Sequence, residues 1–414
     1  MALSFARSWT DEDLNRWRDT CARFVAEELL PDDEAARKRG NVGLGVWQKA
    51  GALGLLCTDI PEPFGGGGGD FRHEAVLYEE CARLGLSGWG NSVHSIVAHY
   101  FLNHGTPDQQ QRYLPRMARG ELVGAIAMTE PGAGSDLQGI RTRAEKRSSA
   151  DGEHYLINGS KTFITNGLLA GVVLVVCKTD PAQGARGTSI LIVETGRQAQ
   201  GRSQACLTPA GGGAAPGDDP GGATTCEGYR VGRVLDKLGR KSQDTSELFF
   251  DDVRVPAANL LGGAEGQGFY QLMGDLPYER LIIGVTALAT MEGAYQATLA
   301  YVRERKAFGK PIAELQNTRF KLAEVATTIQ VGRAFIDRCV EQLVAGTLDT
   351  ATASMAKLWA SEAQGRVLDE CLQLFGGYGF MNEYVIARMY ADARVQRIYG
   401  GTSEIMKEVI SRAL

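Results

Sequence analysis

The sequence predicts a multidomain α+β protein, with an N-terminal α-helical domain, a middle antiparallel β-barrel and a C-terminal four-helix bundle. Three observations predict this order. Apolar residues recur at helical spacing up to about residue 122 and again after residue 256. Between these stretches the apolar period changes to two, and Val, Ile and Thr become frequent, as in strands. A chain of 414 residues is long enough for two to three domains. We expect the domains to occupy residues 1–122, 123–255 and 256–414.

The composition argues against several classes of protein. The formal net charge is -5, with acidic and basic residues interspersed, whereas nucleic-acid binding needs a basic stripe. The eight cysteines contain no Cys-x-x-Cys pair, so neither a zinc site nor a disulfide framework is expected. No apolar run approaches the length of a membrane span, and the acidic residues from Asp11 onward are unlike a secretory or transit segment. We expect a cytoplasmic protein with no membrane or nucleic-acid partner.

The N-terminal part shows helical periodicity. Thr10 is predicted to cap the first helix, with acidic residues in its first turn. Further helices are predicted over residues 46–55, 71–84, 93–103 and 109–118. The consecutive glycines Gly65 to Gly69 are interpreted as a flexible connector between two of these helices. His94, His99 and His104 fall five residues apart, which is not one helical face, so no metal site is expected.

The rest of the chain first alternates and then returns to helices. Strands are predicted over residues 123–128, 155–158, 172–177, 189–193 and 247–250. Between about residues 196 and 229 the sequence is largely Gly, Pro, Ala and Ser, which predicts a disordered surface insertion. A disulfide between Cys206 and Cys226 is not expected in a reducing compartment. Beyond Pro256, amphipathic helices are predicted over residues 281–301, 312–344, 351–374 and 385–394, as in an up-down bundle.

The stretch from Met128 to Ile140 has the features of a binding turn. It offers the hydroxyls of Thr129 and Ser135, while Gly132 and Gly134 let the main chain approach a flat or anionic group. A plain surface turn is the simpler alternative. The spacing differs from Gly-x-Gly-x-x-Gly because the third glycine is missing. A nucleotide bound here is therefore not held in the Rossmann manner.

This stretch resembles the flavin-contacting signature of the acyl-CoA dehydrogenase family, and five further blocks resemble other signatures of that family in the same order. The five are Gly159–Gly167, Lys237–Pro256, Arg305–Lys310, Leu374–Gly379 and Ile398–Met406. Together the six blocks span nearly the whole chain. The resemblance implies FAD as cofactor, an acyl-CoA substrate, electron-transferring flavoprotein as electron acceptor and a homotetramer. The insertion at 196–229 is a departure, because the family has only a short turn there.

The position of the catalytic base is a second departure. Many members of the family carry the base immediately before Gly-Thr in the C-terminal turn, where this sequence has Gly400. Long-chain and isovaleryl members carry it on a bundle helix instead. The segment Leu276–Leu281 resembles that helix, with Glu279 at the position of the base. The alternative is an exposed Glu279 that pairs with Arg280 or Arg303.

The resemblance also implies contacts to the reactants. Gly400 would donate its backbone N–H to the thioester oxygen. Pro277 is expected to kink the helix or to start it afresh, which would aim Glu279 into the slot. The implied FAD contacts are Met128, Thr129, Ser135, Phe163, Thr165, Arg305, Phe308, Gln316, Gln373, Gly377, Thr402 and Glu404, of which Gln316, Gln373 and Gly377 would come from the partner subunit. The implied substrate contacts are Ser135, Arg280 and Tyr399.

The function expected from these residues is FAD-dependent α,β-dehydrogenation of a medium- to long-chain acyl-CoA in fatty acid β-oxidation, most similar to the long-chain type. Gly88, Gly90 and Ser92 are expected to leave a tunnel deep enough for a long chain, unless Trp89 closes it. Three alternatives stay open. They are a dehydrogenase for a branched or carrier-protein-tethered acyl group, a flavin-containing acyl-CoA binding protein without turnover, and an oxidase.

Overall fold

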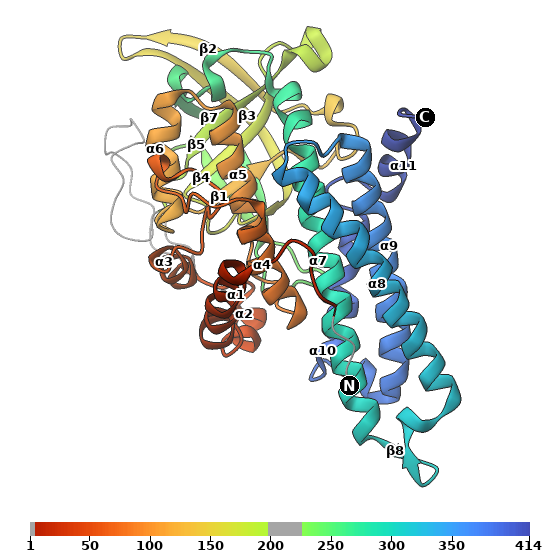
Figure 1. Ribbon diagram of the computed structural model, residues 1–414. Helices are drawn as coiled ribbons and strands as arrows, with labels where there is room; N and C mark the ends of the chain where they lie inside the picture. The colour runs from red at the N-terminus through yellow and green to blue at the C-terminus, as the bar shows by residue number, and fades with distance from the viewer. Residues whose placement is uncertain (1–4, 198–225) are drawn as a thin grey trace.

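The computed structural model describes residues 5–197 and 226–414, and it packs a curled sheet against two sets of helices (Figure 1). The predicted order of helical, sheet and helical regions is confirmed. Most of the Gly-rich insertion expected at 196–229 lies outside the described residues, and so does Cys206. Within the described ranges, no helix combines the length and the apolar character that a membrane span requires.

The N-terminal region contains six α-helices among the described residues. They are α1 (Glu12–Phe24), α2 (Asp33–Arg39), α3 (Leu44–Ala52), α4 (Phe71–Arg83), α5 (Asn91–His104) and α6 (Pro107–Ala118). The predicted cap of α1 is wrong by one residue, because the Asp11 side chain, and not Thr10, accepts the backbone N–H of Leu14. Asp11 has the extended backbone of an N-cap, and its carboxylate reaches a free N–H of the first turn.

The consecutive glycines form a fixed loop, so the predicted flexible connector is wrong. The N–H groups of Gly67, Gly68 and Gly69 donate to the carbonyl oxygens of Cys57, Ile60 and Thr58, respectively. A Cβ added at Gly66 would lie 2.1 Å from the Ile60 carbonyl oxygen. Glycine is needed here because two backbone segments touch. The loop ends at Asp70, whose side chain caps α4.

In the described residues, the middle region forms one seven-stranded sheet with mixed pairing. Its strands are β1 (Gly124–Ala127), β2 (Arg143–Ser149), β3 (Gly152–Thr165), β4 (Val172–Lys178), β5 (Thr188–Glu194), β6 (Tyr229–Val234) and β7 (Thr245–Pro256). Their order is β1-β4-β2-β3-β7-β6, with β5 paired to β4. Because β1 runs parallel to β4, the sheet is not wholly antiparallel as predicted. After β1 the chain makes the β2–β3 hairpin before β4 returns beside β1.

The C-terminal region is built around one long central helix. Its elements are α7 (Gly268–Glu304), the β8 (Lys306–Ala307) and β9 (Lys310–Pro311) hairpin, α8 (Gln316–Val344), α9 (Thr350–Phe375), α10 (Val385–Ala393) and α11 (Ser403–Ser411). Helix α7 packs against α4, α5, α8 and α9. It runs without a break through Pro277, so the predicted start at residue 281 is wrong. The hairpin lies at the opposite end of the bundle from the sheet (Figure 1).

A buried network of charges joins the N-terminal segment to the bundle. Arg333 on α8 pairs with Glu79 of α4 at 2.9 Å, Glu292 of α7 at 2.5 Å and Asp337 at 3.0 Å. Arg7 pairs with the same two glutamates at 2.6 and 2.9 Å. Each carboxylate is therefore matched by arginine nitrogens in the interior. Segments about 250 to 330 residues apart in sequence are thereby fixed to one another.

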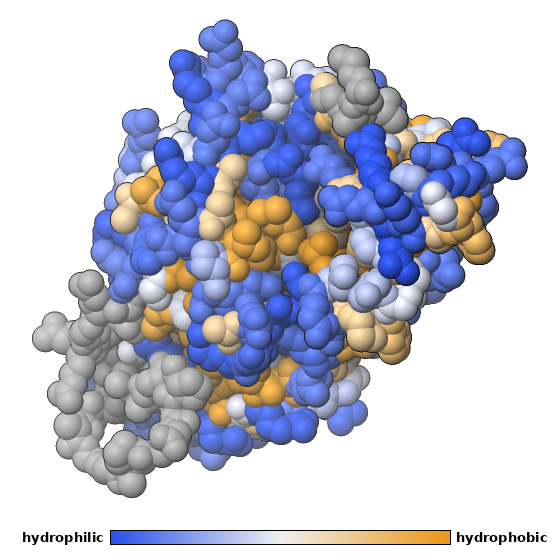
Figure 2. Space-filling model, turned by 90° about the horizontal axis from the view of Figure 1, so that it is seen from below, coloured by the Kyte–Doolittle hydropathy of each residue, from blue (hydrophilic) through white to orange (hydrophobic). Residues whose placement is uncertain are grey.

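Large apolar side chains also lie on the surface. Phe308 in the hairpin is 91% exposed and Phe380 after α9 is 81% exposed. Figure 2 shows apolar atoms gathered in the middle of the face seen from below, bordered by hydrophilic residues. Large contiguous apolar patches on protein surfaces commonly serve as contact sites for other molecules.

Candidate active site

Glu279 is a buried carboxylate on the inner side of α7. Its side chain is 9% exposed, and its Oε1 accepts a hydrogen bond of 3.0 Å from the Tyr100 hydroxyl of α5. Burial raises the pKa of Glu279 to about 7; Asp275 adds to the rise, while Tyr100 and Arg280 oppose it. The alternative of an exposed carboxylate paired with an arginine is wrong.

Arg280 points away from the carboxylate that precedes it. Its side chain is 3% exposed, and the guanidinium donates to the Ser354 hydroxyl of α9 at 2.9 Å. Successive residues on a helix face directions about 100° apart, so Glu279 and Arg280 serve different neighbours. The structure does not join the two in an ion pair. The substrate contact expected for Arg280 stays a prediction.

The Gly400 turn lies against α7 one helical turn beyond Glu279. A Cβ added at Gly400 would lie 2.5 Å from Ile283 Cδ1, and Gly400 has a φ of +62°. A carboxylate-bearing residue at this position would meet Ile283 and strain the backbone. The Lys357 ammonium donates to the Gly401 carbonyl oxygen at 2.5 Å and fixes the turn. Glu279 thus lies close in the fold to Gly400, the position at which many members of the resembling family carry the base.

The residues on either side of the Gly400 turn make contacts of their own. Thr402 caps α11, because its hydroxyl accepts the Ile405 N–H at 3.3 Å, and Glu404 follows in the first turn of that helix. On the other side, the Arg240 guanidinium lies 5.3 Å from the centre of the Tyr399 ring. Thr402 therefore has a structural role as the N-cap of α11, and a cofactor contact would be additional.

The glycine-rich turn after β1 is held by a buried ion pair. Glu130 accepts hydrogen bonds from the N–H groups of Arg141 and Thr142 and from the Lys161 ammonium at 2.8 Å. Lys161 also donates to the Met128 carbonyl oxygen at 2.9 Å. Burial opposes ionisation of Glu130, but Lys161 and these donors hold its pKa below the usual value. Both residues lie in the sequence blocks that resemble the family, but no local pattern marks either of them as a partner of the other.

The turn leaves its glycines, a hydroxyl and an aromatic ring open to a ligand. A Cβ added at Gly132 or Gly134 would have no atom of the described residues within 4 Å, and Ser135 is exposed. Phe163 lies where the register of β3 against β7 shifts; it has a φ of +60° and is 67% exposed. An exposed ring in a left-handed conformation costs backbone energy and packing, which indicates a use at the surface. Thr129 and Thr165 are half-buried.

A second group of predicted cofactor contacts lies elsewhere in the chain. Phe308 has a φ of +53° in the hairpin, and the Arg305 guanidinium lies 6.0 Å from the Tyr378 ring centre. Gln316 begins α8, while Gln373 and Gly377 lie where α9 ends. This group occupies the end of the bundle opposite the sheet (Figure 1). One chain does not bring it together with the glycine-rich turn.

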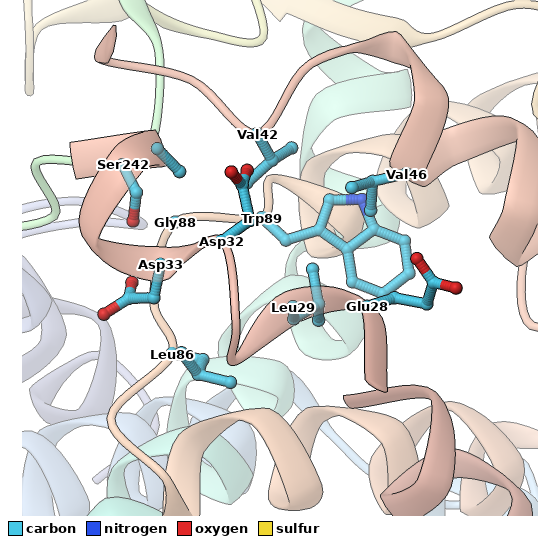
Figure 3. A pocket seen from close by; sticks show the side chains of 11 residues that line it. Glu28, Leu29, Asp32, Asp33, Val42, Val46, Leu86, Gly88, Trp89 and Ser242 are labelled. Carbon is cyan, nitrogen blue, oxygen red and sulfur yellow. The ribbon is translucent and has the colours of Figure 1, made fainter. Parts of the chain in front are cut away.

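The small residues before α5 do not form a tunnel. A Cβ added at Gly88 would lie 1.9 Å from Ser242 Oγ, and one at Gly90 would lie 2.0 Å from Asn166 Oδ1. These glycines allow close packing, so the expected opening is wrong there. Trp89 is 6% exposed and lines a cavity of only about 20 Å³, enough for about one water (Figure 3). Its ring packs 5.5 Å from those of Phe24 and Trp47.

Comparison with known proteins gives matches over nearly the whole length of the chain. Family models described as the acyl-CoA dehydrogenase N-terminal, middle and C-terminal domains match residues 11–121, 125–253 and 266–414. The mitochondrial long-chain specific acyl-CoA dehydrogenase of Rattus norvegicus is 47% identical over 401 residues, which cover 96% of this chain and 85% of that protein.

Solved structures give the same result. An acyl-CoA dehydrogenase from Geobacillus kaustophilus has a TM-score of 0.88 and 41% identity, and the match covers 99% of both chains. A glutaryl-CoA dehydrogenase from Mycobacterium smegmatis in complex with FADH2 has a TM-score of 0.84 and 27% identity, over 98% of this chain and 95% of that chain.

Proposed function

The chain belongs to the acyl-CoA dehydrogenase family and is an oxidoreductase, and we propose that it oxidises a medium- to long-chain acyl-CoA to the trans-2-enoyl-CoA with FAD. The observation that carries this proposal is Glu279, a buried carboxylate beside the Gly400 turn. The long-chain relative supports the chain length. The glutaryl relative has the same fold and a different substrate, so it supports the reaction class alone.

Glu279 would remove the α-proton of the thioester. A general base works best when its pKa lies near the working pH, because it is then both ionised and a good proton acceptor. Burial brings the pKa of Glu279 to about 7, which meets this condition near neutral pH. Helix α7 holds the residue on a rigid element instead of a loop. The base can therefore be strong without being exposed to water.

Gly400 would stabilise the charge that develops on the thioester oxygen. Its N–H donates to no acceptor among the described residues, so it is available to a ligand. The Lys357 bond to Gly401 keeps the turn in place and brings a positive charge to it. A fixed N–H in a buried site stabilises an oxyanion strongly, because it need not reorient during the reaction.

The residues of the glycine-rich turn and of β3 fit a flat cofactor. Met128, Thr129, Ser135, Phe163, Thr165, Thr402 and Glu404 would hold the ring end of FAD, and Arg305, Phe308, Gln316, Gln373 and Gly377 would hold its adenosine end. The open space at Gly132 and Gly134 and the exposed Phe163 ring support the first group. When bound, FAD supplies the acceptor for the β-hydrogen, which leaves as a hydride.

The distance between these two groups supports assembly of several copies. Arg305 and Phe308 lie at the end of the bundle opposite the sheet (Figure 1), so they would reach the same FAD from a neighbouring subunit. The exposed rings of Phe308 and Phe380 would then be covered. A homotetramer, as expected for the family, satisfies this requirement. Electron-transferring flavoprotein would reoxidise the flavin.

The test is an anaerobic titration of the flavin-loaded protein with saturated acyl-CoAs of four to sixteen carbons, straight and branched. Loss of flavin absorbance reports oxidation of the thioester, and free CoA is the control that should leave the absorbance unchanged. The proposal expects the largest bleaching with a medium or long straight chain. A preference for branched or four-carbon substrates would overturn the chain length. No bleaching of a bound flavin by any thioester would overturn the reaction.

A further inference from the structure

Glu279 belongs to a ladder of side-chain pairs between α5 and α7. In the first rung the Tyr100 hydroxyl donates to Glu279 Oε1 at 3.0 Å. In the second, His104 Nε2 lies 2.8 Å from Asp275 Oδ2, and Asn103 donates to Asp275 Oδ1 at 2.6 Å. Tyr100 and His104 are four residues apart, and so are Asp275 and Glu279. Residues at this spacing share one helix face, so the two rungs are in register.

The first rung distinguishes the two oxygens of the base. Tyr100 is fully buried and occupies Oε1, while Oε2 accepts no hydrogen bond from any residue in the described ranges. Oε2 is therefore the oxygen free to take a proton. Donation from a hydroxyl favours the ionised carboxylate, whereas a nearby negative charge opposes it. Asp275 supplies that charge: its side chain is 5% exposed and is held by α5.

We propose, on the basis of the function proposed above, that Tyr100 and Asp275 are positioning residues for the base: Tyr100 holds Oε1 so that Oε2 faces the substrate, and Asp275 keeps Oε2 basic. The two act on Glu279 in opposite directions. Tyr100 lowers the pKa of Glu279 and Asp275 raises it. Outside the two rungs, the titratable or charged groups nearby are Tyr278 and Arg280 on α7, His99 on α5, Asp59, and Glu74 on α4.

The test compares the pH dependence of kcat/KM, measured with the acyl-CoA that bleaches the flavin best. Tyr100→Phe should move the acid limb of the kcat/KM pH profile to higher pH by roughly 1–2 units. This is the pKa shift that one hydrogen bond to a charged group supplies. Asp275→Asn should move the limb to lower pH by a smaller amount. Opposite shifts are expected because the two residues stabilise different protonation states of Glu279.

Tyr113→Phe is the matched control. Tyr113 is also a fully buried tyrosine, and it donates to a glutamate, Glu194, at 2.8 Å. Tyr113→Phe should leave the acid limb of the kcat/KM profile unchanged. If Tyr100→Phe and Asp275→Asn shift the limb in the same direction, or if neither shifts it, the inference is overturned. If Tyr100→Phe prevents folding, Asp275→Asn alone tests the inference, and an acid limb that is unshifted or moved to higher pH overturns it.

A double-mutant cycle in denaturant unfolding separates this inference from the proposed function. Tyr100→Phe and Glu279→Gln should be non-additive at pH 8, where Glu279 is ionised, whereas Tyr113→Phe and Glu279→Gln should be additive. If no acyl-CoA is oxidised, the proposed function fails, but the cycle still shows whether Tyr100 acts on Glu279. Additivity of Tyr100→Phe with Glu279→Gln would overturn the inference even in an active enzyme.

Discussion

Glu79 on α4 and Glu279 on α7 are both buried glutamates, 0% and 9% exposed, yet their pKa values move in opposite directions. Burial raises the pKa of Glu279 to about 7. Burial also disfavours the charge of Glu79, but Arg333, Arg7 and Arg18 outweigh it and lower its pKa to about 2. The Glu79 carboxylate has guanidinium nitrogens at 2.6, 2.9 and 3.1 Å. Among the residues that the structure describes, Glu279 has one hydrogen-bond donor, the Tyr100 hydroxyl at 3.0 Å.

This difference shows that burial alone does not make a catalytic base. Removal from water penalises the charge of both carboxylates in the same way. The partners then decide the outcome: three arginines turn Glu79 into a fixed anion of the scaffold, and the weak partner of Glu279 leaves it able to gain and lose a proton. The four predictions below test this distinction, from the largest expected effect to the smallest.

Removing the carboxylate of Glu279 should have the largest effect. Glu279→Gln should lower the rate of flavin reduction by about 10²–10⁴-fold, the range that general-base catalysis contributes. Flavin content should be unchanged, because no predicted FAD contact is altered. Rapid mixing with acyl-CoA under anaerobic conditions measures the rate. Glu145→Gln on the exposed strand β2 is the control, and a Glu279→Gln variant as fast as that control would remove Glu279 from the mechanism.

Removing the carboxylate of Glu79 should affect stability instead of rate. Glu79→Gln leaves buried arginine charge without its partner, which costs about 3–5 kcal/mol of unfolding free energy. Denaturant unfolding measures the loss, and Glu145→Gln should stay within about 0.5 kcal/mol of wild type. The rate per folded, flavin-loaded subunit should not change. A tolerated Glu79→Gln would contradict the scaffold role.

The contributions of Glu279 and Glu79 to the free energy of unfolding should depend on pH in opposite directions. The pKa of Glu279 is raised from 4.5 to about 7, so the folded state binds its proton more tightly than the unfolded chain. Its contribution favours folding at low pH and is lost as the pH rises through about 7, a change of about 3 kcal/mol. The pKa of Glu79 is lowered from 4.5 to about 2, so its contribution is present above pH 4.5 and is lost as the pH falls toward 2.

Unfolding free energies at pH 5 and pH 8 check the first of these signs. Glu279→Gln cannot titrate, so its stability relative to wild type should be higher at pH 8 than at pH 5. A pH-independent difference between the two proteins would contradict the raised pKa.

Replacing Arg280 should have the smallest effect of the four changes. It lowers the pKa of Glu279, but less than the Tyr100 hydrogen bond does. Arg280→Gln should therefore move the acid limb of kcat/KM to higher pH by less than about one unit, and Arg280→Lys, which keeps the charge, should not move it. A rise of KM without any shift would instead support the substrate contact expected from the sequence.

Periodicity was enough to predict most of the fold. It failed for elements whose sequences do not show the usual spacing of apolar residues. Strand β2, from Arg143 to Ser149, carries charges on both faces and is largely exposed, so no alternation was visible. Helix α7 begins at Gly268, well before the predicted start, because Pro277 interrupts the sequence pattern while packing against α4, α5, α8 and α9 holds the helix together.

The site was predictable only in part, because its partners are distant in sequence. Glu279 and Gly400 were singled out through resemblance to a family. Tyr100 is 179 residues from Glu279 and Lys357 is 44 residues from Gly401, and no local pattern connects them. Gly88 shows a different failure: a missing side chain was interpreted as open space, whereas it marks close packing against Ser242.

The left-handed backbone at Phe163 and Phe308 has a consequence for anyone who would make this protein more heat-tolerant. Both positions have positive φ and large exposed rings, so a search for stabilising changes would choose them early for replacement by Gly or Asn. Such replacements would both relieve backbone strain and remove exposed apolar surface. If both rings serve the cofactor, the sturdier protein would be the one that loses its flavin.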